Sequence, residues 1–476
     1  MSAYRMLING QLKNGESGDL PVTNPANELE IASAPIASKA QLDCAVKAAR
    51  SSQPGWAALS LSQRSACIKQ VIEVMLGDSQ RLTKLLVTET GKPLALAQFE
   101  LDLARQFLQQ AADSNLPVEL LADSPENRIV LKYRPLGVSA AIVPWNFPLL
   151  IGMIKLGAAL MSGCTVVLKP SPQAPLTLLH LGALLSETVP AGVLNIISGD
   201  DELGPWLTSH QGVDKISFTG STATGQAILA QAASDVKRVT LELGGNDAAI
   251  VLPNADIGAI AESIFTSAFV NSGQACVGIK RLYVHESLYE PMLGALGQIA
   301  SHVQVGNGME DTTVLGPIQN EQQYQEVLST LEQVEASDAR IICGGSALPR
   351  PGYFISPTVV ADVSEGCPLV DEETFGPVLP VISYTDIEEV ILRANETSYG
   401  LGGSVWGSDV EQATEIAERL ECGTAWVNQH AALDPRAPIS GTKWSGLGVE
   451  SGMDCLKEFC RPQVTNIMIS PQGATE

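Results

Sequence analysis

The chain has little positive charge, and its cysteines and histidines form no metal-binding pattern. It carries 29 lysines and arginines against 52 aspartates and glutamates, so its formal net charge is −23. A surface this acidic repels phosphate backbones and anionic membranes, which argues against nucleic-acid binding. The nine cysteines include no CxxC pair and the five histidines are scattered, so no metal site is predicted. An odd, irregularly spaced set of cysteines is typical of reduced thiols in a cytoplasmic protein.

The sequence also lacks a secretory signal at its start and an uninterrupted membrane span. Its first 15 residues contain no apolar signal core. The longest uncharged run, residues 136–154, contains Pro144, Asn146 and Pro148. These residues favour a strand, a loop and a buried helix over a span. We therefore expect a cytoplasmic protein without a membrane partner.

Aromatic residues make up only 5% of the chain, whereas hydrophobic residues make up 45% of its 476 residues. This length and composition suit a large α/β protein with more than one domain. Consecutive helices are predicted from Ser38 to Asp113, with Ser38 and Ser62 as N-caps. From residue 138 the pattern changes to short apolar strands that alternate with helices. This alternation predicts a parallel, doubly wound sheet of the dinucleotide-binding type.

The strands of this sheet are predicted at residues 138–143, 165–168, 193–197, 215–218 and 238–243. Helices are predicted between them, at residues 149–161, 175–188, 202–209 and 223–233. A second α/β unit is expected to begin near Gly244, with a strand at 248–252, a helix at 257–270 and a later helix at 410–420. Residues 127–133 and 464–469 show two further strand patterns.

A glycine-containing loop, Phe218 to Gly225, lies between a predicted strand and a predicted helix. Gly220 and Gly225 allow close approach of a ligand, and Ser221 adds a hydroxyl donor. A helix that begins just beyond them presents free N–H groups, which suit a pyrophosphate. A GxxxxG pattern alone also occurs in tight turns, so the argument depends on its position after a strand.

Cys276 follows an apolar helix in a loop of small residues, Asn271 to Cys276. Small neighbours leave its thiol accessible, and a thiolate is a strong nucleophile that forms thioesters. The alternative is a buried structural cysteine, which we favour for the other eight.

Polar side chains end several of the predicted strands. Glu242 ends an apolar strand, where burial raises the pKa of a carboxyl toward that of a general base; a capping role is equally open. Asn146 follows the first parallel strand and has an amide suited to a developing oxyanion, although an isolated asparagine there is more often a turn residue. Lys169 ends the second strand and faces the same crevice as the phosphate loop.

Six ordered segments closely resemble those of the aldehyde dehydrogenase superfamily. They are PWNFP at 144–148, VLKPS at 167–171, FTGSTATG at 218–225, LELGGN at 241–246, SGQAC at 272–276 and EETFGPV at 372–378. The resemblance covers nearly the whole chain, including PISGTKWSGLG near its end. It implies a Rossmann-type cofactor domain, an α/β catalytic domain and small oligomerisation strands.

The resemblance also implies a role for each matching residue. Cys276 is implied as the nucleophile, Glu242 as the base that activates water, and Asn146 with the Cys276 N–H as the oxyanion hole. NAD is the implied cofactor, with NADP also accepted. The implied cofactor contacts are Ile142, Trp145, Lys169, Gly220, Ser221, Gly225, Glu373 and Phe375.

Two departures bear on specificity. Many NAD-preferring members have a glutamate three positions after the strand-end lysine, where this chain has Pro172, so some tolerance of NADP is expected. The implied substrate contacts are Phe147, Leu433 and Ile439. Arg436 in the same late loop would anchor the carboxylate of a semialdehyde, although a solvated surface arginine is the simpler interpretation.

The resemblance divides the chain into a cofactor domain (1–118 and 139–243), a catalytic domain (244–425) and oligomerisation strands (119–138 and 460–476). It implies a homodimer or homotetramer that acts on a small-molecule aldehyde. Two rival functions stay open. An acylating relative would transfer the acyl group to coenzyme A, but such relatives generally lack the glutamate at Glu242. A non-catalytic protein of the same fold would tend to lose Cys276 or Glu242.

Overall fold

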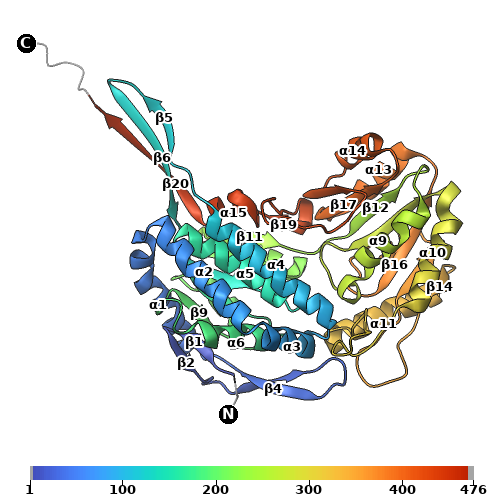
Figure 1. The fold of residues 1–476 in the computed structure, drawn as a ribbon, viewed down its shortest axis with the longest axis horizontal. Helices are drawn as coiled ribbons and strands as arrows, with labels where there is room; N and C mark the ends of the chain where they lie inside the picture. The colour runs from blue at the N-terminus through green and yellow to red at the C-terminus, as the bar shows by residue number, and fades with distance from the viewer. Residues whose placement is uncertain (1–3, 470–476) are drawn as a thin grey trace, which may run out of the picture.

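The computed structural model describes residues 4–469 and consists of two α/β lobes and a projecting arm of strands (Figure 1). The first lobe contains an eight-stranded sheet, in which β11, β10, β7, β8 and β9 are parallel and the outer strands are antiparallel. In spatial order its strands are β19 (Gly446–Leu447), β11 (Arg238–Glu242), β10 (Lys215–Thr219), β7 (Val138–Ile142), β8 (Thr165–Lys169), β9 (Leu194–Ile196), β1 (Met6–Ile8) and β2 (Gln11–Lys13).

Helices cover both faces of this sheet, and β7, β8 and β10 are therefore buried along their whole length. One face is covered by α1 (Lys39–Ala58), α7 (Leu203–Ser209) and α8 (Thr222–Ala232). The other is covered by α5 (Pro148–Ser162) and α6 (Leu176–Leu185), with α2 (Leu61–Gly77), α3 (Ser79–Thr90), α4 (Leu94–Asp113) and α15 (Gly452–Glu458) packed outside them. The carboxyl ends of the parallel strands face the second lobe.

The second lobe contains a seven-stranded sheet that is parallel except for one edge strand. Its order is β14 (Arg340–Cys343), β15 (Thr358–Ala361), β16 (Val378–Tyr384), β13 (Ile279–His285), β12 (Asp247–Val251), β17 (Gly402–Trp406) and β18 (Thr424–Val427). Its helices are α9 (Ile257–Phe269) and α10 (Tyr289–His302) on one core, α13 (Ile387–Asn395) and α14 (Val410–Ala417) on another, and α11 (Glu321–Glu335) with α12 (Pro368–Asp371) beside them.

The arm is a three-stranded antiparallel sheet of β5 (Glu119–Asp123), β6 (Asn127–Pro135) and β20 (Cys460–Met468). It extends away from both lobes in Figure 1. A two-stranded sheet of β3 (Asp19–Thr23) and β4 (Glu30–Pro35) completes the described strands.

The predicted fold class, the parallel sheet and the helices between its strands are confirmed, with ends shifted by a few residues. Ser38 caps α1 as predicted, but the cap of α2 is Ser60 and not Ser62. The Ser60 hydroxyl and the Gln63 side chain form a capping box, so the helix begins at Leu61, two residues earlier than a cap at Ser62 would give. The strands of residues 6–35 were not predicted because three of the four contain only three to five residues.

Residues 136–154 contain β7, a loop and the first part of the buried helix α5, as predicted. Among residues 4–469, no helix combines the length and the apolar character needed to cross a membrane.

Candidate active site

The loop that carries Cys276 has an unusual backbone. Asn271, Ser272 and Gly273 have φ values of 51°, 56° and 74°, a left-handed conformation that only glycine adopts without strain. At Gly273 an added Cβ would overlap the carbonyl oxygen of Gly376. Side chains hold the loop: the Lys280 ammonium donates to the Gly273 carbonyl at 2.5 Å, and the Ser272 hydroxyl donates to the Gly316 carbonyl at 2.7 Å. These two hydrogen bonds stabilise the strained conformation of the loop.

The Cys276 thiol is half-buried and surrounded by acidic groups. Burial, with the negative charges of Glu373, Asp247 and Glu242, raises the pKa of this thiol to about 12. The thiol is therefore protonated at neutral pH in this arrangement. A charge change in the site, or a base nearby, is needed to generate the thiolate.

Glu242 ends β11 and its side chain is buried. Its Oε1 has no hydrogen-bond partner within the described residues. Burial, reinforced by the charge of Glu450, holds the pKa of the Glu242 carboxyl well above its usual range, while Lys155 opposes the shift. The rise in pKa expected from the sequence is therefore present, and a carboxyl with a raised pKa suits the role of a general base.

Asn146 lies between β7 and α5, and its side chain is buried. Its amide nitrogen donates to the Gln274 carbonyl at 3.1 Å, which connects it to the Cys276 loop. Because a carboxamide has two N–H groups, one remains for another acceptor. The backbone carbonyl of Asn146 accepts a hydrogen bond from the Lys92 ammonium at 2.7 Å.

A cavity of about 270 Å³ brings several predicted residues together. Its walls include the predicted nucleophile, the predicted oxyanion amide and five predicted cofactor contacts: Cys276, Asn146, Trp145, Gly220, Ser221, Glu373 and Phe375. Leu243, directly after Glu242, also lines it. The cavity is therefore lined by residues of both lobes, and Cys276 and Asn146 are among them.

A larger cavity of about 750 Å³ shares Trp145, Gly220 and Ser221 with the first and continues past the ends of β7 and β8. Ile142 and Lys169 line it, as predicted. Burial lowers the pKa of Lys169 to about 8, against the opposing charges of Asp201 and Asp200. Within residues 4–469 the Lys169 ammonium has no hydrogen-bond or ion-pair partner, so a buried cation faces a cavity large enough for a dinucleotide. These features fit a ligand that brings polar oxygens to Lys169.

The phosphate loop differs in detail from its prediction. Helix α8 begins at Thr222, between the two glycines and not beyond them, because the Ser221 hydroxyl accepts the Thr224 N–H as an N-cap. Gly220 lines both cavities. Gly225 lies buried in the helix, where an added Cβ would overlap the Leu243 side chain, so it allows α8 to approach β11. In the described chain Gly225 lines neither cavity, and the cofactor contact expected of it stays a prediction.

Glu373 and Phe375 follow α12 and reach across the cavity toward the first lobe. The Gly245 N–H donates to the Glu373 carboxylate at 3.1 Å, and burial raises the pKa of this carboxyl to about 7. The Phe375 ring meets Trp145 edge-on, with centroids 5.5 Å apart. Lys280 lies 5.2 Å from the centre of the same ring. Lys280 was not singled out in the sequence, since a lysine in a strand carries no signal of its surroundings.

The predicted substrate residues Phe147, Leu433 and Ile439 are partly buried and pack against one hydrophobic core. Arg436 lies elsewhere: its side chain is 79% exposed and forms a bidentate ion pair with Asp434. In the described chain, neither cavity wall includes Arg436, and neither includes Phe147, Leu433 or Ile439. The solvated alternative for this arginine therefore agrees with its position.

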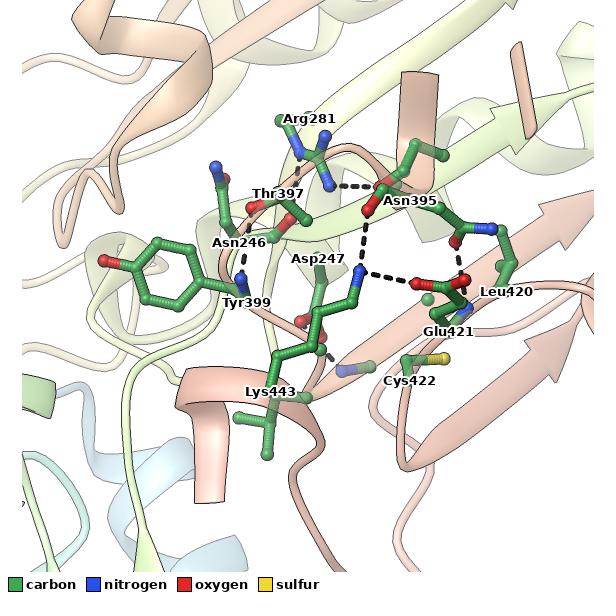
Figure 2. Close-up of a pocket in the computed structure, with 16 residues that line it drawn as sticks. Asn246, Asp247, Arg281, Asn395, Thr397, Tyr399, Leu420, Glu421, Cys422 and Lys443 are labelled. Atoms are coloured by element: carbon green, nitrogen blue, oxygen red, sulfur yellow. Dashed lines mark hydrogen bonds and ion pairs between the residues drawn. The ribbon is translucent and has the colours of Figure 1, made fainter. Parts of the chain in front are cut away.

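A smaller cavity, of about 20 Å³, begins where the Gly244–Gly245 turn ends and has room for about one water molecule. Figure 2 shows Lys443 crossing it to bind the Asn395 carbonyl at 2.6 Å and the Glu421 carboxylate at 2.8 Å. Two residues on, the Ser445 carbonyl accepts the Leu243 N–H at 2.8 Å. Lys443 therefore anchors the segment that supports the end of the Glu242 strand.

Comparison with known proteins places this geometry in a family. The family model described as "Aldehyde dehydrogenase family" matches residues 12–465. DhaS of Bacillus subtilis (strain 168), a protein assigned as an aldehyde dehydrogenase, is 37% identical over 96% of this chain and 94% of its own length. The Escherichia coli (strain K12) succinate-semialdehyde dehydrogenase [NADP(+)] GabD is 36% identical over 95% of both chains.

The solved structures agree. The NAD+ complex of an aldehyde dehydrogenase from Bacillus cereus superposes with a TM-score of 0.96 at 35% identity, covering 98% of this chain and 97% of that chain. A family match over nearly the whole length, together with a fold that superposes on a member of the family, leaves one assignment. The chain belongs to the aldehyde dehydrogenase family and oxidises aldehydes with NAD or NADP as its cofactor.

Proposed function

We propose that this chain converts an aldehyde to its carboxylic acid through a thioester on Cys276, which water activated by Glu242 then hydrolyses. The observation that carries the proposal is a single cavity in which Cys276 and Asn146 lie with Glu373 and Phe375. The buried carboxyl of Glu242 ends the strand that leads into the same wall.

The residues divide the reaction between them. The Cys276 sulfur, once deprotonated, adds to the aldehyde carbon, and the developing oxyanion receives hydrogen bonds from the Asn146 amide and the Cys276 N–H. Bound NAD(P) supplies the acceptor for the hydride that leaves this carbon. Glu242 then takes a proton from a water molecule that attacks the thioester carbonyl, and the acid departs as the sulfur is released. The raised pKa of Glu242 suits this proton transfer.

The cofactor would occupy the larger cavity. Lys169 would bind the adenosine ribose beside Ile142, Trp145 and Ser221 would contact the pyrophosphate, and Glu373 and Phe375 would contact the nicotinamide end. Pro172 lines this cavity in place of a carboxylate, which favours some use of NADP beside NAD. Asp201 lines it as well and moderates that tolerance by repelling a 2′-phosphate.

For the substrate we propose a neutral aldehyde that passes Phe147, Leu433 and Ile439. The alternative, a semialdehyde anchored by Arg436, has less support because that guanidinium is bound to Asp434. We further propose a cytoplasmic homodimer or homotetramer that pairs through the arm. In it, residues 1–118 and 139–243 form the cofactor domain, 244–425 the catalytic domain, and 119–138 and 460–476 the oligomerisation strands. Residues 470–476 lie outside the described part of the chain.

The test is a panel of aliphatic, aromatic and carboxylated aldehydes with NAD and NADP, in which reduced cofactor and acid are both quantified. The wild-type chain should form acid without coenzyme A. Glu242→Gln should release about one equivalent of reduced cofactor per active site and then slow by at least about 100-fold, because the thioester is no longer hydrolysed. Cys276→Ala should form none.

Absence of reduced cofactor with every aldehyde would contradict the proposal and support a non-catalytic protein. A requirement for coenzyme A would indicate the acylating class. A selective loss of activity toward carboxylated aldehydes in Arg436→Ala would restore the semialdehyde alternative.

A further inference from the structure

A buried ion pair lies behind the loop that carries Asn146. Lys92, in the turn between α3 and α4, pairs with Glu100 on α4, and both side chains are fully buried. Burying two charges costs free energy that their attraction only partly offsets, so such a pair needs further hydrogen bonds. Both residues make such bonds, and all of them go to the segment that begins at Asn146.

Lys92 holds the start of that segment. Its ammonium donates to the Asn146 carbonyl at 2.7 Å and lies 4.1 Å from the centre of the Phe147 ring. The Asn271 amide donates to the same carbonyl at 3.3 Å, from the loop that carries the nucleophile. The position of the Asn146 peptide therefore depends on a charged donor in the turn between α3 and α4.

Glu100 holds the other side of the same turn. Its Oε1 accepts the N–H groups of Leu149 and Leu150 at 2.9 and 3.1 Å. These are first-turn donors of α5, which have no partner within the helix, and the N-cap residue Phe147 makes no side-chain cap. A carboxylate at this end also complements the helix dipole. Glu100 thus stabilises the start of α5 while it fixes the Lys92 ammonium.

The two contacts determine where the Asn146 amide lies. With the peptide held by Lys92 and the following helix held by Glu100, the side chain reaches the Gln274 carbonyl at 3.1 Å, two residues before Cys276. One remaining amide N–H is then directed by a rigid backbone. Electrostatic stabilisation of an oxyanion depends on donors that are already in place, and a shift of about 1 Å costs on the order of 100-fold in rate.

We infer that Lys92, held by Glu100, is a positioning residue that sets the oxyanion-binding amide of Asn146. The inference rests on the proposed function, because the role of Asn146 comes from it. In this assignment Lys92 contacts neither substrate nor cofactor: it holds the Asn146 peptide carbonyl and also packs against the Phe147 ring.

The test is a double-mutant cycle on the purified full-length enzyme with NAD and a turned-over aldehyde. Lys92→Met alone would leave the Glu100 carboxylate buried without its partner, so the pair is replaced as Lys92→Met/Glu100→Gln, which keeps an acceptor oxygen at residue 100. This pair should lower kcat by about 10- to 100-fold with little change in the KM for NAD. The rate at which iodoacetamide alkylates Cys276 should stay within about threefold of wild type, since the thiol keeps its surroundings.

The decisive comparison uses Asn146→Ala. In that background the Lys92→Met/Glu100→Gln pair should lower kcat by no more than about threefold, because the residue through which it acts is gone. Equal losses in both backgrounds would overturn the inference and leave a general structural role. If Asn146→Ala itself retained full kcat, the oxyanion assignment of the proposed function would fail, and the inference with it.

Glu89→Gln is the matched control. Glu89 is a buried carboxylate on α3 that accepts the N–H groups of Leu176 and Thr177 at 2.7 and 2.9 Å, at the start of α6. It caps a helix as Glu100 does but makes no contact with Asn146. Its replacement should change stability and leave kcat within about threefold; a kcat loss equal to that of the Lys92 pair would overturn the inference.

If the Lys92 pair were to yield too little folded enzyme, Lys92→Arg gives the same cycle, with coupling to Asn146 supporting the inference and additivity overturning it.

Discussion

At the scale of single residues, Cys276 combines a nucleophilic position with surroundings that disfavour its ionised form. Glu373, Asp247 and Glu242 all contribute negative charge, and burial removes water from the thiol. A thiol with a pKa near 12 reacts slowly with adventitious electrophiles and oxidants, because these attack the thiolate. In the proposed function Glu242 and Glu373 serve other steps, which would explain their presence beside a nucleophile.

We predict that alkylation of Cys276 by iodoacetamide in the nucleotide-free enzyme accelerates about tenfold for each pH unit and reaches no plateau below about pH 10. The sign follows from a thiolate fraction that grows as the pH rises toward about 12. Glu373→Gln should increase the rate at fixed pH, since it removes the charge that raises the pKa of the thiol most. Mass spectrometry of the Cys276 peptide measures the rate.

Glu326→Gln provides the control for charge in general. Glu326 lines the same cavity but does not contribute to the raised pKa of the thiol. Its replacement should leave the alkylation rate within about twofold. A plateau near neutral pH, or equal acceleration by both substitutions, would contradict the assigned electrostatics.

At the scale of elements, the segment from α3 to α4 stabilises two helices of the first lobe. Glu100 accepts the first N–H groups of α5, and Glu89 accepts those of α6. Neither helix has a side-chain cap of its own, so both starts depend on carboxylates from outside. The start of α5 follows β7 and the loop that carries Asn146, and the start of α6 follows β8, which ends at Lys169. The outer helices therefore stabilise the elements that carry the site.

Glu89 gives this element a dependence on pH. Burial raises the pKa of its carboxyl to about 7, against hydrogen bonds that lower it. The pKa of this carboxyl is higher in the folded chain, so its protonated form stabilises the fold. This contribution is fully present below the unfolded pKa of about 4.3 and is lost as the pH rises through about 7. Ionised Glu89 is thus less favourable to the fold than its protonated form.

We therefore predict that Glu89→Gln gains stability relative to wild type as the pH rises. Relative to that of wild type, the free energy of unfolding of Glu89→Gln should increase by about 1–3 kcal/mol between about pH 5 and about pH 8. Parallel thermal or urea unfolding of both proteins across this range measures it. A difference that stays constant with pH would show that Glu89 does not titrate in the fold.

At the scale of the whole molecule, the arm leaves most of its side chains exposed or only partly buried by the rest of its own chain. Its strands present exposed apolar side chains: Leu120, Leu121, Val464, Ile467 and Met468. Exposed apolar groups gathered on a projecting sheet are typical of surfaces that pair with another subunit. This supports the proposal that the arm joins copies of the chain.

We predict that Met468→Asp, at a side chain 72% exposed on the arm, shifts the enzyme to a smaller assembly. A buried charge in an interface costs several kcal/mol unless it is paired, which is enough to dissociate it. Sedimentation at several protein concentrations measures the mass. Val236→Asp, at an exposed side chain on the turn between α8 and β11, is the control and should keep the wild-type mass. An unchanged mass in Met468→Asp would argue against an arm-mediated assembly.

Much of this molecule was predicted from local patterns. Alternation of apolar strands and amphipathic helices predicted the order of elements from residue 138 to residue 270, because it records burial directly. Cys276, Asn146, Trp145, Glu373 and Phe375 were brought together by resemblance, and the structure places them on one cavity. The start of α8 and the packing role of Gly225 were missed, since a cap and a close contact depend on one hydroxyl and one neighbour.

The sequence by itself determined the family, the nucleophile and the order of elements, because ordered motifs and burial periodicity are local properties of the chain. Only the tertiary structure decided which charges act on them. The Lys92–Glu100 pair behind Asn146 and the Glu450 and Lys155 charges on Glu242 bring together residues that lie far apart in the sequence. Such contacts depend on three-dimensional distance and on loss of water, and a linear pattern records neither.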